Sequence, residues 1–180
     1  MKNWRDRFGL RQFFILELDM MKGDFINRLQ RIVDHGSTGM FSDPFEAFSS
    51  SENIYKGEVH SSGFKIKRRK RMFDFNHGSV LAIGSIKQEN DKIIINTEIS
   101  GVGKGFIFFY ILLIAFYLIF IGIAFFLPSE GSGGLPLFVI PFILLHAVFM
   151  LGIPFMIMKK SVARTKYDLE REFFYLTRKG

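Results

Sequence analysis

Two long stretches of the chain are apolar on every side, whereas the remainder alternates between apolar and polar positions. Residues 106–127 and 135–158 contain no acidic side chain, Lys or Arg, and a short polar turn joins them. A helix rises about 1.5 Å per residue, so each run is long enough for a hydrocarbon core of ~30 Å. A chain of this size could not cover two such helices on all sides. The pattern therefore predicts a hairpin of two transmembrane helices.

In the region before the hairpin, the spacing of apolar residues changes from alternation to a helical repeat and back to alternation. Residues 11–20 alternate, with Phe14 and Leu16 on one face and Phe13 and Ile15 on the other, which predicts a strand. Residues 24–35 repeat their apolar positions every three or four residues, which predicts a helix. We expect Asp24 to cap the start of this helix and Gly36 to stop it.

Short apolar runs separated by turn residues then predict an antiparallel meander. The expected strands cover residues 55–60, 64–75, 80–87 and 93–100. After the second apolar run, residues 159–180 carry one apolar stripe, which predicts an amphipathic tail helix that packs on the meander. Its apolar members are Val162, Leu169, Phe173 and Leu176, with Lys166 between them.

Together these elements predict an integral membrane protein with three segments. The first is a cytoplasmic α+β region over residues 1–104, with an antiparallel meander and an amphipathic helix. The second is a two-span α-helical hairpin over residues 105–158, inserted in that small domain. The third is the cytoplasmic amphipathic tail helix over residues 159–180.

The distribution of charge predicts the orientation. Of the 24 Lys and Arg residues, 17 lie in residues 1–104, 7 lie in residues 159–180, and none lies between. Cytoplasmic flanks of membrane spans are enriched in Lys and Arg. We therefore expect a protein of the bacterial inner membrane with both termini in the cytoplasm. The chain has no Cys, which excludes disulfides and Cys-ligated zinc.

A basic run at residues 65–71 is the candidate contact site. In a strand, Lys65, Lys67, Arg69 and Arg71 share one face. Near a cytoplasmic bilayer surface each charge is worth ~1 kcal/mol with anionic lipid. The alternatives are a partner protein or a solvated face. Nucleic acid is disfavoured because no aromatic stacking platform or recognition helix accompanies the run.

One polar residue, His146, is the only ionisable group within a predicted span. An intramembrane ionisable residue is a functional hypothesis by default, but a proton relay would need a partner, and no Asp, Glu or second His lies in either span. A hydrogen bond to the neighbouring helix or to a backbone carbonyl is the favoured interpretation. No His pair, paired carboxylates or nucleophile motif is present, so we expect no catalytic residue, metal or cofactor.

The order of these features resembles small bacterial two-span membrane proteins with a β-rich cytoplasmic region. The resemblance rests on residues 63–68, 84–86 and 93–95, and covers about residues 54–127. It implies an architecture and no activity. The first functional hypothesis is a noncatalytic accessory or regulatory subunit of a larger inner-membrane complex, with other membrane subunits as partners. The alternative is a membrane-surface sensor of anionic lipid or a small ligand, and a membrane enzyme is disfavoured.

Overall fold

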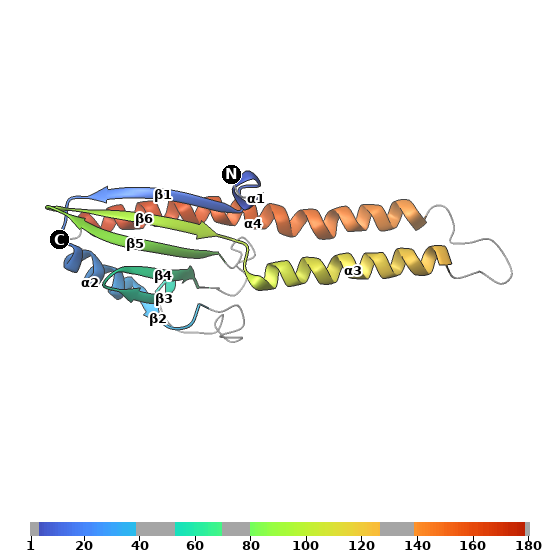
Figure 1. Ribbon diagram of the computed structural model, residues 1–180, viewed down its shortest axis with the longest axis horizontal. Coiled ribbons are helices and arrows are strands. Elements are labelled where there is room, and N and C mark those ends of the chain that lie inside the picture. Colours follow the sequence, from blue (N-terminus) through green and yellow to red (C-terminus); the bar gives the residue numbers. More distant parts are fainter. Residues whose placement is uncertain (1–3, 39–52, 70–79, 127–138, 179–180) are drawn as a thin grey trace. The chain divides into compact units, whose positions relative to one another are not determined.

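The computed structural model describes residues 4–38, 53–69, 80–126 and 139–178 (Figure 1). The chain divides into two compact units. The sheet unit comprises Met1–Gly103 and Ile157–Gly180, and the hairpin unit comprises Lys104–Met156.

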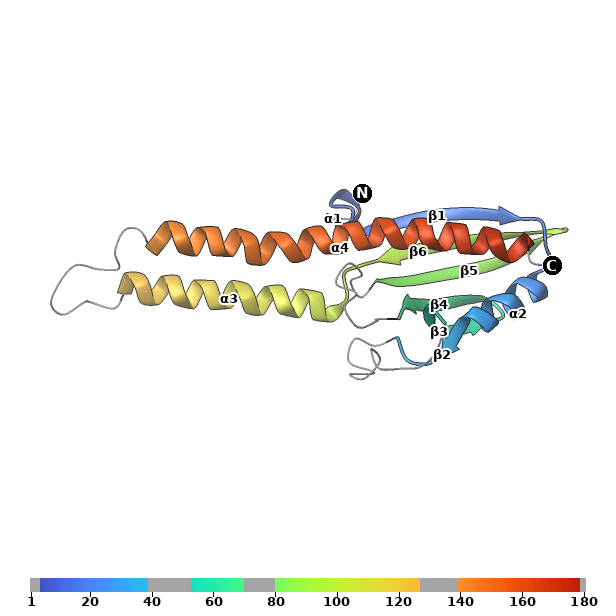
Figure 2. The same cartoon turned by 180° about the vertical axis from the view of Figure 1, so that it is seen from behind.

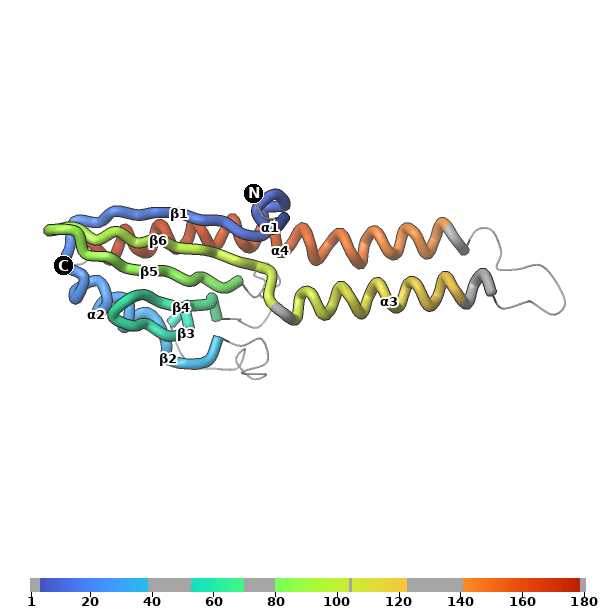
Figure 3. Tube along the Cα trace, in the orientation of Figure 1, coloured from blue at the N-terminus to red at the C-terminus, as the bar shows by residue number. Residues whose placement is uncertain are grey.

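The sheet unit is built on one six-stranded sheet with the order β1-β6-β5-β4-β3-β2, whose path is traced in Figure 3. Every neighbouring pair is antiparallel except β2 and β3, which run parallel. The strands are β1 (Arg11–Leu18), β2 (Val33–His35), β3 (Tyr55–His60), β4 (Gly63–Arg68), β5 (Leu81–Glu89) and β6 (Lys92–Ser100).

The predicted meander is confirmed for its core, because β3 to β6 are sequential antiparallel neighbours. The sheet as a whole is mixed, because the unpredicted strand β2 pairs in parallel with β3 at one edge. The predicted helix ends early: α2 covers Lys22–Ile32, and the next three residues form β2. Val33 pairs with Tyr55 and is buried, so tertiary pairing overrides the helical period there. Asp24 lies in the first turn of α2, whereas Met21 occupies the N-cap position.

Two helices cover the same face of this sheet, as Figure 2 shows from behind. Phe173 of α4 is fully buried, and its ring centroid lies 5.4 Å from that of Phe25 in α2 and 5.4 Å from that of Phe64 in β4. Phe14 of β1 completes the cluster at 6.2 Å. The predicted packing of the tail stripe on the sheet is confirmed, since all its apolar members are buried: Val162, Leu169, Phe173 and Leu176.

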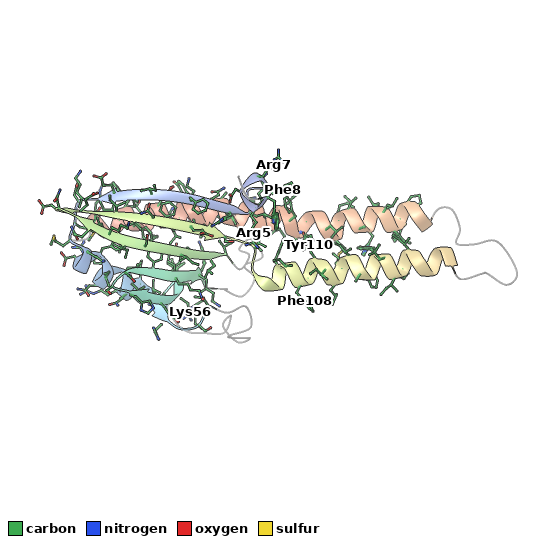
Figure 4. The ribbon with its side chains drawn as sticks, in the orientation of Figure 1. Arg5, Arg7, Phe8, Lys56, Phe108 and Tyr110 are labelled. Carbon is green, nitrogen blue, oxygen red and sulfur yellow. The ribbon has the colours of Figure 1, made fainter. Side chains whose placement is uncertain are left out.

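The tail is not a separate helix, because α4 runs unbroken over Val139–Arg178. The other long helix is α3 (Lys104–Phe126), and a short helix α1 (Trp4–Arg7) precedes β1. α3 and α4 are long and apolar enough to cross a membrane by length and composition. Within the hairpin unit large apolar side chains are exposed, among them Phe108, labelled in Figure 4, and Phe142. The ends of both predicted spans at residues 127 and 135–138 lie outside the described residues.

Candidate functional site

The candidate site is the outer face of the sheet, opposite α2 and α4. Strand pairing aligns outward-facing residues into rows that cross the sheet from β1 to β3. Because side chains alternate along each strand, the members of a row share this face. The central row consists of Phe13, Glu98, Ile83, Lys65 and Glu58.

An apolar groove occupies the β1 side of this face. Phe13, Ile15 and Ile83 are 53%, 72% and 47% exposed, although their neighbours in sequence point into the core. We call the recess formed around these three side chains the apolar groove. It has a volume of about 390 Å³. Its floor and walls come from three adjacent strands: Phe13, Phe14, Ile15, Ile83, Gly84, Ser85, Asn96, Thr97 and Glu98.

A salt bridge borders the apolar groove. The Arg11 guanidinium donates two hydrogen bonds to the Glu98 carboxylate, at 2.6 and 2.7 Å. The same guanidinium lies 4.6 Å from the centroid of the Phe13 ring, which is a cation–π contact. The hydrogen bond with Glu98 raises the pKa of Arg11, so the guanidinium stays protonated. This bidentate pair restricts the position of Phe13 before anything binds.

Lysines occupy the β3–β4 side of the same face. Lys65 is exposed and Lys67 is half-buried, both on the outward side of β4, as the strand period predicts. Lys67 lies opposite Lys56 of β3, labelled in Figure 4. Burial lowers the pKa of Lys56, and the neighbouring charges of Lys67 and Arg69 lower it further. The outer face is therefore apolar on one side and cationic on the other.

Arg69, a third member of the predicted cationic face, does not extend it. β4 ends at Arg68, and the side chain of Arg69 is 9% exposed and forms an ion pair with Asp34. A strand pattern alone could not anticipate this, because Asp34 reaches the site through the unpredicted strand β2. Arg71 lies outside the described residues. Sequence reasoning also missed Ile83. The feature that could have identified it is an apolar side chain at a strand position that alternates with the inward-facing Ala82 and Gly84.

His146 lies in the hairpin unit and is bonded to the other helix. Its Nδ1 lies 2.7 Å from the Tyr117 hydroxyl of α3, a hydrogen bond between the two helices. A hydrogen bond to the neighbouring helix is one of the two contacts that the favoured interpretation named. The Tyr110 hydroxyl of α3 also donates to the Leu151 carbonyl of α4, at 2.6 Å.

Comparison with known proteins gives no match to a family model, a curated protein or a solved structure. Among the described residues, no group of three His, Asp or Glu side chains is placed to hold a metal ion. What the described outer face offers chemically is an apolar contact surface beside lysines.

Proposed function

We propose that the protein is a noncatalytic accessory or regulatory subunit of a larger inner-membrane complex. In this proposal α3 and the apolar part of α4 anchor it in the bilayer, and the outer face of the sheet binds an acidic partner subunit. One observation carries the proposal: no described element covers the apolar groove, whose residue Ile83 pairs with Lys65. Exposed apolar side chains that cluster on a surface mark interaction sites.

The hairpin unit supports the membrane anchor. The large apolar side chains of both helices are exposed, as lipid contact requires, and His146 is a polar exception among the exposed residues. The hydrogen bonds of Tyr110 and Tyr117 join the helices through groups that would otherwise meet hydrocarbon. We expect both termini in the cytoplasm. Reporter fusions after Gly180 and within residues 129–134 test this, and a periplasmic signal from the Gly180 fusion would contradict it.

Two carboxylates favour a protein partner over a lipid surface on the outer face. Glu98 and Glu58 lie in the same row as Lys65, one on each side of it. An anionic bilayer would be repelled by Glu58 and would gain nothing from Glu98, whose charge Arg11 already compensates, whereas a partner can place its own charges against each group. The apolar groove would form the dry centre of such an interface, with Lys65 at its rim.

Photo-crosslinking in cells tests the proposed surface. A photoreactive residue at position 83 is expected to crosslink to one protein at stoichiometric yield, through a peptide rich in Asp and Glu. The matched control places the photoreactive residue at position 21, because Met21 is at least as exposed as Ile83 but lies at the start of α2. We expect Ile83→Asp and Lys65→Glu to abolish co-purification of the same protein in mild detergent, and Met21→Asp to preserve it.

Two results would overturn the accessory-subunit proposal. Crosslinks from position 83 to lipid alone would favour the alternative, a membrane-surface sensor that binds anionic lipid. Equal crosslinking from positions 21 and 83 would mean that capture is not specific to the outer face.

A further inference from the structure

A second recess lies in the sheet unit between α4 and the strand ends at Tyr55, the first residue of β3, and Arg68, the last residue of β4. Its volume is about 260 Å³. Six of its seven lining residues are charged or carry a hydroxyl: Tyr55, Arg68, Arg164, Asp168, Arg171 and Glu172, with Ile54 as the apolar wall. We call it the arginine cleft.

Helical spacing brings four of the charged residues together. Arg164, Asp168, Arg171 and Glu172 lie at i, i+4, i+7 and i+8, on one face of α4. Arg68, the last residue of β4, reaches them from the sheet and donates to Asp168 at 2.7 Å. The Arg171 guanidinium also approaches Asp168, at 3.8 Å.

The balance of charge in the arginine cleft favours an anion. Three guanidinium groups face two carboxylates, and Asp168 is shared by two of the arginines. Within the described chain, Arg164 forms no ion pair. A planar guanidinium with free N–H groups suits bidentate contact with phosphate or carboxylate.

Tyr55 adds a neutral donor to these cations. Its ring is almost fully buried, and its hydroxyl has no hydrogen-bond partner among the described residues. Burial raises the pKa of Tyr55, and the charges of Asp168 and Glu172 raise it further. The hydroxyl therefore stays protonated at neutral pH and can donate a hydrogen bond to a bound oxygen atom.

We propose that the arginine cleft binds a compact phosphate monoester or diester, contacted by Arg164, Arg171 and the Tyr55 hydroxyl. The cleft is smaller than the ~300–1,000 Å³ typical of small-molecule pockets, so it fits a phosphate with a short substituent rather than a nucleotide. Arg68 keeps its bond to Asp168 and so compensates the charge of that carboxylate. This site is independent of the outer face and of any partner bound there.

The phosphate can come from a lipid headgroup or from a soluble metabolite. Arg164 follows Met158, the last residue of the second predicted span, by six positions on α4, or ~9 Å at 1.5 Å per residue. In a bilayer, Arg164 would therefore lie at the depth of the headgroup phosphates. The chemistry is shared by both sources, and two arms of one experiment separate them.

In the soluble arm, the full-length protein in phosphatidylcholine nanodiscs is titrated calorimetrically with glycerol 3-phosphate. In the lipid arm, native mass spectrometry counts the phosphatidylglycerol molecules retained by the protein after exchange from mixed micelles. A saturable signal in the first arm identifies a soluble ligand, and retention of one phosphatidylglycerol in the second identifies a headgroup.

Three variants distinguish the arginine cleft from general charge attraction. We expect Arg164→Gln to weaken binding at least about tenfold, because a charge-assisted contact is lost. Tyr55→Phe keeps the buried ring and removes only the hydroxyl, so we expect a smaller loss of several fold. Arg178→Gln removes the same charge from the end of α4, outside the cleft, and should leave binding within about twofold.

The proposal is overturned if neither probe binds, or if Arg178→Gln weakens binding as much as Arg164→Gln. It is also overturned if both Arg164→Gln and Tyr55→Phe bind like the unmodified protein. Tyr55→Phe keeps the test decisive should Arg164→Gln fail to fold.

Discussion

Phe13 and Phe14 are consecutive residues of β1, yet one ring is 53% exposed and the other 7%. Phe14 joins the aromatic cluster around Phe173, under the cover of α2 and α4. Phe13 lies on the face that no described element covers, where Arg11 stacks against it. Near β1 both faces of the sheet carry apolar side chains, but helices pack only on the inner face within the described chain. An apolar residue on the inner face stabilises the fold, and one on the outer face is available for binding.

The largest contrast is expected at Phe173. Phe173→Ala removes a fully buried ring from contact with three other aromatic side chains and leaves a cavity. We expect it to lower the free energy of unfolding of the sheet unit by about 3–5 kcal/mol. Hydrogen exchange of the β6 amides in detergent measures this. The control is the adjacent, half-exposed Phe174, and an equal loss for Phe174→Ala would contradict the assignment of faces.

Gly84 offers a second test of the inner face. A Cβ at this position would collide with the ring of Phe64, its partner on β4. We expect Gly84→Ala to destabilise the sheet by about 1–3 kcal/mol, because the ring must leave its place in the cluster. A Cβ on Gly23 in α2 meets no atom within 4 Å, so Gly23→Ala should instead stabilise by about 0.5–1 kcal/mol. Thermal unfolding should show a lower Tm for Gly84→Ala and a higher Tm for Gly23→Ala. A change of Tm in the same direction for both variants would contradict this prediction.

On the outer face we expect binding and stability to separate. Ile15→Thr keeps a β-branched residue on the strand and removes apolar surface that is already exposed. The free energy of unfolding should change by no more than about 0.5 kcal/mol, while co-purification of the partner falls. A larger destabilisation would show that the apolar groove is covered within the chain itself.

The smallest expected effect concerns Lys56 at the cationic side of the outer face. Its pKa is lowered by burial, by Lys67 and by Arg69, relative to its ordinary value of 10.5. The folded state thus disfavours the charged form of Lys56, which lowers the free energy of unfolding while the amine is protonated in both states. As the pH rises from the lowered pKa towards 10.5, the folded protein loses this proton before the unfolded chain does, and the destabilisation disappears. The stability of the unmodified protein should therefore rise relative to that of Lys56→Met over this range. If the difference in stability between the unmodified protein and Lys56→Met did not change with pH, the lowered pKa of Lys56 would be contradicted.

Local periodicity predicted most of the elements of the sheet unit. Strand alternation placed Phe14 and Phe13 on opposite faces, and the helical stripe of the tail identified Phe173 as a core residue. Both follow from geometry within one element, which needs no knowledge of its neighbours. The same reasoning failed for residues 33–35, because Val33 gains more by pairing with Tyr55 in a sheet than by continuing the helix.

The candidate sites show where sequence reasoning ends. Strand periodicity placed Lys65 and Lys67 together correctly, but it could not show that Arg69 bonds to Asp34. Nor could it join Arg68 to Asp168, which are separated by a hundred positions and meet only when α4 packs on the sheet.

The sequence by itself determined the two apolar runs, the clustering of charge outside them and the period of each strand and helix, because these depend on neighbouring residues alone. Only the tertiary structure decided which face of the sheet is covered, which arginines are paired and where recesses form. These depend on contacts between segments distant in the chain, and the same alternating pattern is compatible with cover on either face.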